Sequence, residues 1–368
     1  MSGVASLFSD EFYRLARRHL APGGVLVQWF QLYEIDVTLV ASMMRALAQN
    51  FPDYAVYAAT DSDILVVAGE APTLARPLAD VFRALPGVGS ELRKVHVQTI
   101  GDIELRRLGG KTVLHPLFLS YNVPANSDYH PYIDLNAARH RFLQTGAGEL
   151  TRLGAAGVPV TEILERRPRS GRPASLDGDD YLERIEKARR ATYARDFLLG
   201  AVRPEPRGIP SQLQRDLELA RMRGIDCVDP RKSDLWIRSA TNIARAVNAA
   251  LPPAEAAAVW RAFEAAPCAE LLGTPERRWL DLFAAVAERD APGMARLAGE
   301  LLADARAQTP AVRHYLLTAA LAGLIAERRY DAALQAWNAH ARGIAVDLDV
   351  RLLYAYLAVA RRLNVPLD

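Results

Sequence analysis

The chain has 368 residues with a formal net charge of +2, and 50% of its residues are hydrophobic and 24% charged. This length is enough for two or three globular domains, each with its own core. The small net charge argues against a nucleic-acid partner held by a basic surface.

The two cysteines and the apolar runs bound the compartment. Cys227 and Cys268 are too few and too far apart in sequence to predict a disulfide framework or a zinc site. No apolar run approaches the roughly 20 residues that a membrane helix needs, and the first residues lack the basic-then-apolar pattern of a signal peptide. We therefore expect a reduced, cytoplasmic environment.

The first predicted elements are a helix, a turn and a strand. Apolar residues recur at helical spacing over residues 7–20, with charged residues on the other side, which predicts an amphipathic helix lying on a sheet. Ser9 or Ser6 can cap its start, and Pro22 cannot continue it. Residues 25–30, VLVQWF, form a short apolar run typical of a strand covered on both faces in a parallel sheet.

Helix, turn and buried strand together predict half of a doubly wound α/β unit. Ligands of such sheets bind outside the carboxyl ends of the strands, so polar residues at that end are the candidates for substrate contact. Here they are Gln28, Gln31, Tyr33 and Glu34. Gln28 stands out because an amide in an apolar strand is costly unless it is hydrogen-bonded.

This unit resembles a known family. The run SGVASLFSDEFYRLARRHLAPGGVLVQW is similar to the segment that follows the catalytic aspartate of spermidine synthase-like (polyamine aminopropyltransferase) domains, with Gly23-Gly24 and Gln28 at matching places. The resemblance covers residues 1–136. It implies the C-terminal part of a Rossmann-like methyltransferase/spermidine synthase sheet. Ordinary methyltransferases share this fold, so the resemblance does not single out one reaction.

This chain lacks several elements of the family pattern. The family's glycine-rich turn, its ribose-binding acidic residue and its catalytic aspartate all precede the matching segment, and this chain begins at Met1 without them. We therefore expect an incomplete and inactive portion of an enzyme. Only the complete protein would use decarboxylated S-adenosylmethionine, with a polyamine or other small amine as acceptor. Relatives of this family are often fused to membrane-spanning segments, so attachment to such a segment upstream is an alternative.

The resemblance assigns one site residue, and the chemistry of nearby side chains suggests four more. It places Gln28 at a strand end facing the amine pocket. Trp29 and Tyr33 would wall a pocket for an alkylammonium chain by cation–π contact, and Glu34 and Asp128 would pair with its ammonium groups. Each candidate also has a structural alternative. Gln28 would bond to loop backbone groups, the two aromatic rings would belong to the core, and the two carboxylates would be solvated.

The rest of the predicted sheet is a hairpin. Residues 37–47 form an amphipathic helix with Asp36 as its cap. Residues 54–59 alternate and residues 64–68 are continuously apolar, with a turn between them. In a methyltransferase-like sheet the last strand inserts antiparallel beside the strand at 25–30. We therefore expect the second hairpin strand inside and the first one at the edge.

The following segment is less regular. Residues 74–85 and 100–108 are expected to be short helices, and residues 112–136 a long, proline-punctuated loop. Within that loop Asn126-Ser127-Asp128 is similar to the segment that closes spermidine synthase-like domains of the fused kind. Otherwise Asp128 caps a turn.

No metal site is expected near this loop. Three histidines lie close to it in sequence, but none has ligand spacing with a cysteine or carboxylate on a helix. They are His115, His130 and His140.

The domain prediction follows from a change in composition. Residues 1–165 would form the partial α/β domain, and residues 166–180, rich in Arg, Pro, Gly, Ser and Asp, a linker. Residues 181–368 carry only helical periodicity, with two units near the tetratricopeptide-like period of about 34 residues. This predicts an all-α helical-repeat domain, or a simple helical bundle.

The sequence is compatible with three functions. The first is the aminopropyltransferase-like enzyme described above. The second is an interaction protein, with the helical repeats presenting a surface to a protein partner and the α/β part as scaffold. The third is an S-adenosylmethionine-dependent methyltransferase. An exposed edge of residues 25–30 would also make the chain a homo-oligomer or prone to aggregation.

Overall fold

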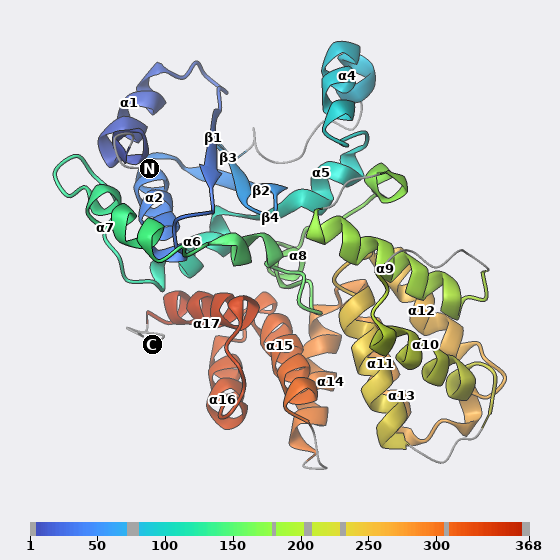
Figure 1. Ribbon diagram of the computed structural model, residues 1–368. Coiled ribbons are helices and arrows are strands. Elements are labelled where there is room, and N and C mark those ends of the chain that lie inside the picture. Colours follow the sequence, from blue (N-terminus) through green and yellow to red (C-terminus); the bar gives the residue numbers. More distant parts are fainter. Residues whose placement is uncertain are drawn as a thin grey trace. The chain divides into compact units, whose positions relative to one another are not determined.

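The computed structural model describes residues 5–71, 81–178, 182–201, 208–228, 233–304 and 309–362. The fold is mixed α/β, with a four-stranded sheet and many helices (Figure 1). The chain divides into two compact units. Unit 1 comprises Met1–Leu153, Pro173–Ser175 and Val350–Asp368, and unit 2 comprises Gly154–Arg172 and Leu176–Asp349. Among the described residues, no helix has the length and apolar character needed to cross a membrane.

Unit 1 contains the sheet. Its strands are β1 (Leu26–Gln31), β2 (Asp53–Thr60), β3 (Asp63–Gly69) and β4 (Arg107–Gly110). Its helices are η1 (Ala5–Phe8), α1 (Asp10–His19), α2 (Val37–Asn50), α3 (Val81–Ala84), α4 (Pro86–Lys94), α5 (Ile100–Arg106), α6 (Lys111–Leu119), α7 (Tyr132–Phe142), η2 (Gly148–Arg152) and most of α17 (Leu348–Ala360). Part of the helix predicted over residues 74–85 lies outside the described residues.

The sheet has the order β1-β3-β2-β4, and all of its described pairings are antiparallel. Val66 of β3 lies opposite Gln28 of β1 and Val56 of β2. The predicted hairpin and the internal position of its second strand are therefore confirmed. The edge position predicted for the first hairpin strand is wrong, because β4 pairs with β2. The helix predicted over residues 100–108 instead ends at Arg106, and residues 107–108 belong to β4.

One face of the sheet is buried. Its fully covered residues, which alternate along three strands, are Phe30, Tyr54, Val56, Ala58, Ile64, Val66 and Ala68. The Phe8 ring lies 5.4 Å from the Phe30 ring, so η1 and α1 cover the β1 part of this face. On the opposite face of β1, Val27 is 56% exposed and Trp29 is 50% exposed. Burial on both faces, expected for this strand, is therefore wrong.

Local sequence signals explain the helix starts near the sheet. Ser9 Oγ accepts a hydrogen bond from Phe12 N, which confirms one of the two predicted caps, and Asp36 Oδ1 accepts one from Leu39 N. The long loop predicted over residues 112–136 is wrong at both ends. Helix α6 runs through Pro116, whose ring is buried against the core, and α7 begins at Tyr132.

The regular elements described in unit 2 are all helices. The all-α prediction covered residues 181–368, whereas unit 2 also includes residues 154–172 and ends at Asp349. Its helices are α8 (Val160–Glu165), α9 (Glu183–Leu198), α10 (Ser211–Gly224), α11 (Ser233–Val247), α12 (Pro253–Glu264), η4 (Ala269–Leu271), α13 (Thr274–Glu288), α14 (Ala291–Ala303), α15 (Pro310–Ala326) and α16 (Tyr330–His340). Helices α14 and α15 cross closely at Gly323, where a Cβ atom would lie 2.6 Å from Ala291 O. A side chain there would force the helices apart.

The structure differs from two further expectations. The described part of the predicted linker is not a solvated spacer, because Arg169 is buried and ion-paired with Glu162. Cys227 and Cys268 form a disulfide with 5.3 Å between their Cα atoms, so the inference that they are too far apart was wrong. Sequence separation says little about distance in a helical unit, where α10 and η4 bring these positions together.

Candidate functional site at the end of strand β1

Both polar atoms of the Gln28 side chain have hydrogen-bond partners within unit 1. Its Oε1 accepts a 2.7 Å hydrogen bond from the Tyr13 hydroxyl, and its Nε2 donates a 2.9 Å bond to Leu7 O. Burial raises the pKa of Tyr13 well above its ordinary value, although the bond to Gln28 opposes this rise. The hydroxyl is therefore a neutral donor. In the described structure, Gln28 holds helix α1 and the segment before it against β1.

Trp29 cannot share a pocket with Gln28. Successive side chains of a strand point to opposite faces, so Gln28 points toward α1 and Trp29 points to the other face. The Trp29 indole is half exposed. It lies opposite Leu65 of β3, which is partly exposed, and this pair begins an apolar surface on the uncovered side of the sheet.

Tyr33 and Glu34 lie just beyond β1. Tyr33 forms an isolated antiparallel bridge with Gly146, and its side chain is 49% exposed. Glu34 has a positive φ of 58°, and its carboxylate lies 3.6 Å from Arg141 Nε. Both members of this ion pair are exposed, so the pair holds Glu34 only weakly. These two residues retain polar atoms that are accessible to a ligand.

Asp128 is exposed, and its backbone N–H donates a 2.9 Å hydrogen bond to Glu11 Oε2. The bond involves the Asp128 backbone and leaves its carboxylate in solvent. Among the five candidates (Gln28, Trp29, Tyr33, Glu34 and Asp128) no side chain hydrogen-bonds to another. The structure therefore brings Tyr33 and Glu34 to one strand end but does not join the five into one site.

The residue that organises this segment is Asn126, which is not among the predicted site residues. It is 1% exposed, and its Nδ2 donates to Ala5 O and Phe8 O at 3.0 and 3.2 Å. Its Oδ1 accepts a bond from Ile133 N at 3.2 Å. An amide that carries both donors and an acceptor can satisfy backbone groups from two segments. The sequence offered one signal for it, because Asn126 is the first residue of the Asn126-Ser127-Asp128 run that resembles the closing segment of the family.

The histidines and carboxylates do not converge. Among the described residues, no group of three or more His, Cys, Asp or Glu side chains could hold a metal ion. Burial, helped by the nearby Lys111 and Arg45, lowers the pKa of His115 to about 4. His140 instead lies against Asp36, with 3.5 Å between its Nε2 and the carboxylate. Each of these two histidines has its own local environment.

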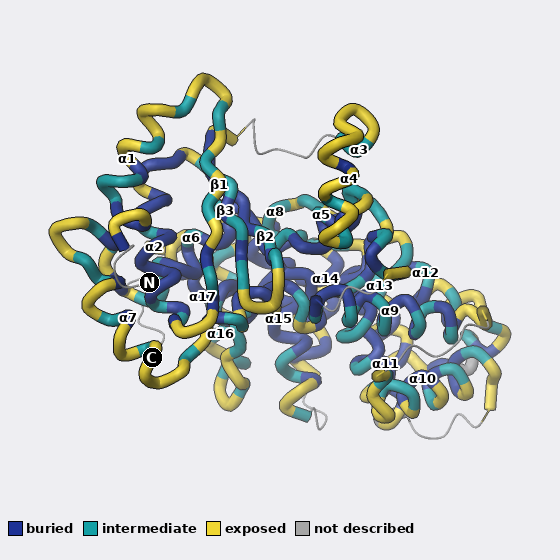
Figure 2. Tube along the Cα trace, turned by 45° about the horizontal axis from the view of Figure 1, so that its top comes forward, coloured by how far each residue is buried: buried dark blue, intermediate teal, exposed yellow. Residues whose placement is uncertain are grey.

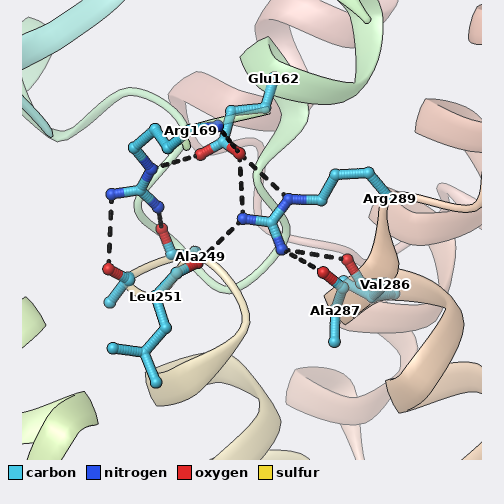
Figure 3. A network of polar contacts seen from close by, with 8 residues as sticks. Glu162, Arg169, Ala249, Leu251, Val286, Ala287 and Arg289 are labelled. Atoms are coloured by element: carbon cyan, nitrogen blue, oxygen red, sulfur yellow. Dashed lines mark hydrogen bonds and ion pairs between the residues drawn. The ribbon is translucent and has the colours of Figure 1, made fainter. Parts of the chain in front are cut away.

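Unit 2 has a buried charge network that was not predicted from the sequence (Figure 3). Glu162 lies between Arg169 and Arg289, at 2.6 Å from Arg169 Nε and 3.0 Å from Arg289 Nη2. The two guanidinium groups donate to carbonyl groups that follow α11 or end α13. These acceptors are Ala249, Ala250, Leu251, Val286 and Ala287. The network satisfies helix ends and leaves no open charge for a ligand.

Unit 2 also has a surface hollow of about 570 Å³ beside the start of α14. Its charged lining residues are Asp290, Arg296, Glu327 and Arg329. Two acidic and two basic groups balance one another, so the hollow does not select one ligand charge.

Comparison with protein-family models, with curated proteins and with solved structures gives no match. The structure itself defines a mixed α/β protein with a small antiparallel sheet and a helical unit.

Proposed function

We propose that unit 1 is the C-terminal portion of a Rossmann-like sheet of the spermidine synthase-like kind. The observation that carries this proposal is the position of β3, which runs antiparallel between β1 and β2. The resemblance implies this arrangement, in which the last strand inserts beside the strand after the catalytic aspartate. Helix α1, the Pro22–Gly24 turn and β1 also follow in the implied order.

Two unfilled surfaces of β1 support a larger sheet. In the described part of the chain β1 pairs with β3 alone, so its other edge carries unpaired backbone groups. The face that bears Val27 and Trp29 is apolar and exposed. A doubly wound sheet would add strands at this edge and helices over this face. The same addition would bring a cosubstrate site next to the carboxyl end of β1.

In the complete enzyme, transfer would form a bond between a neutral amine nitrogen and the propyl carbon beside the sulfonium of decarboxylated S-adenosylmethionine. The carbon–sulfur bond would break, methylthioadenosine would leave, and an acidic group would accept the amine proton. The described residues do not fit the nucleoside, since Gln28 and Trp29 lie on opposite faces of β1 and the five candidates form no common cradle. No step of this transfer is therefore assigned to the chain by itself.

Within this proposal the candidates have different roles. Glu34 would meet the ammonium end of an amine, and Tyr33 would meet its alkyl chain. Gln28 is a positioning residue, because its amide oxygen already holds α1 through Tyr13 and its amide nitrogen holds η1 through Leu7 O. A methyltransferase remains the alternative within the enzyme class. The interaction protein remains the alternative outside it, with the hollow beside α14 as the place where a partner of unit 2 would be sought.

Turnover with two polypeptides tests the proposal. The chain alone should give no spermidine from decarboxylated S-adenosylmethionine and putrescine. The chain fused behind a segment with a glycine-rich turn and a strand-end aspartate should give it. That segment is the in-frame coding sequence before codon 1 or, failing that, the matching half of a spermidine synthase. Methyl transfer without aminopropyl transfer would support the methyltransferase. No nucleoside binding by either fusion would contradict the proposal.

A further inference from the structure

The outward backbone groups of β1 can be identified from its pairing with β3. Leu32 N donates a 2.7 Å hydrogen bond to Ser62 O, in register with the pairs Phe30–Ile64 and Gln28–Val66. In an antiparallel ladder every second residue bonds to the same neighbour. The N–H and C=O groups of Leu26, Gln28 and Phe30 therefore face β3, and those of Val27, Trp29 and Gln31 face away from it.

The strand has none of the usual devices that protect an edge. Natural edge strands carry lysine, proline or a bulge that prevents pairing with another chain. The sequence of β1, LVQWFQ, has no charge and no proline, and its register with β3 is continuous over six pairs. Its exposed side chains, Val27 and Trp29, are apolar and of high β propensity. Figure 2 shows β1 as intermediate or exposed over most of its length.

The geometry points to a second copy of this chain as the occupant of this edge in the 368-residue protein. Two β1 strands can pair antiparallel about a two-fold axis, and opposite residues must then lie on the same face of the joined sheet. With the axis at Gln28, Val27 lies opposite Trp29 of the second copy, and Val25 lies opposite its Gln31. Every outward N–H and C=O from Val25 to Gln31 then has a partner.

Other registers are poorer. Moving the axis to Trp29 or to Val27 leaves one outward residue of this segment without a partner. The register centred on Gln28 also places the exposed indole against an exposed valine, which is a favourable cross-strand pair of an aromatic and a β-branched residue. No like charges meet, because the strand has none. The contact is isologous and closed, so it forms dimers and not filaments.

The dimer does not require aminopropyl transfer. It would, however, use the same outward backbone groups of β1 that an added strand of a complete enzyme domain would use. A strand added by a complete enzyme domain would occupy the same edge. Self-pairing is therefore the state of the chain when nothing else extends the sheet. Association and activity are measured separately, so failure of one proposal is distinguishable from failure of the other.

Size-exclusion chromatography with light scattering, run over a dilution series, tests the dimer. The wild-type chain should move from twice its 40.5 kDa mass toward the monomer on dilution. Val27→Pro removes an outward N–H but no bond to β3, and Trp29→Lys charges the edge. Each should weaken association at least about 100-fold, as expected when the main contact of an interface is lost. Leu65→Lys is the matched control, since it charges the same face one strand away and should leave the dimer intact.

A cysteine series tests the register. Gln28→Cys should cross-link to itself under mild oxidation, because non-hydrogen-bonded antiparallel pairs bring Cα atoms to about 4.5 Å, within reach of a disulfide. Gln31→Cys should not. Circular dichroism melts show whether each variant is folded. A wild-type monomer at all concentrations, open-ended aggregates, a folded Val27→Pro dimer, or equal loss in Leu65→Lys would each overturn the proposal.

Discussion

Glu162 and Arg289, 127 positions apart in the sequence, meet in the core of unit 2, where the carboxylate accepts two hydrogen bonds from one guanidinium at 3.0 and 3.1 Å. Burial alone would raise the pKa of Glu162, but Arg169 and Arg289 outweigh it and hold the pKa below its usual value. This carboxylate fixes two arginines that together bind the carbonyl groups at two helix ends.

Replacing Glu162 by alanine should therefore destabilise unit 2 strongly. The change leaves two buried guanidinium groups without their counter-charge, and we expect a loss of about 3–5 kcal/mol in the free energy of unfolding. Urea titration followed by circular dichroism measures it. Glu300→Ala is the control, because Glu300 and Arg296 form an exposed pair at 3.3 Å whose loss should cost less than about 1 kcal/mol. Similar losses in both variants would contradict this account of the network.

Asp349 should make the stability of unit 2 depend on pH. Burial raises the pKa of Asp349 from 3.8 to about 7, Asp347 adds to the rise, and N–H groups of Gly154 and Ala156 and the charge of Arg184 oppose it. Between these two pKa values, the folded chain therefore holds a proton on Asp349 that the unfolded chain releases. This contribution is complete below the unfolded pKa and is lost as pH rises toward 7, with a slope of at most about 1.4 kcal/mol per pH unit.

Asp349→Asn removes that proton equilibrium and keeps an oxygen to accept the bond from Gly154 N. Urea midpoints measured between about pH 5 and pH 8 should fall with pH more steeply for the wild type than for the variant. Parallel curves for the two proteins would show that Asp349 titrates normally.

The disulfide should stabilise the helical unit. It closes a loop with a sequence separation of 41 and joins the residues after α10 to the start of η4. Removing a cross-link of this span is expected to cost about 2–4 kcal/mol. Dithiothreitol should therefore lower the melting temperature of the wild type but not that of the Cys227→Ser/Cys268→Ser double variant. An unchanged wild-type melt would mean that the bond adds nothing to stability.

Gln28 and Tyr13 should depend on each other for stability. Gln28→Ala leaves the buried Tyr13 hydroxyl without a partner and should cost about 1–3 kcal/mol. Tyr13→Phe removes the same need, so the double variant should lose less than the sum of the single losses, by about 1 kcal/mol. Additive losses would show that Gln28 and Tyr13 do not depend on each other.

Local signals in the sequence were enough for several elements of unit 1. Ser9, as one of two candidates with Ser6, and Asp36 were predicted as caps, and the turn between β2 and β3 was predicted from its polar residues. The resemblance placed β3 next to β1. These features depend on residues close in sequence or on a motif, so periodicity and turn chemistry reach them.

Features set by distant contacts were missed. The exposure of Val27 and Trp29 depends on which layers cover the sheet, and an apolar run does not reveal this. Arg169 looked like part of a solvated linker because its partner Glu162 precedes the run and its carbonyl acceptors lie 80 residues later. The proline in α6 looked like a loop signal. At the candidate site, the sequence identified the accessible Glu34 but not the buried Asn126.

The most direct test of the account is amide hydrogen exchange in β1, resolved by residue at low and high protein concentration. At low concentration, the amides of Gln28 and Phe30 should be protected by β3, while those of Val27, Trp29 and Gln31 exchange quickly. At high concentration the second set should become protected as β1 strands pair. Equal protection of both sets at the lowest concentration would mean that another part of the chain already covers this edge, and would contradict both the open sheet and the dimer.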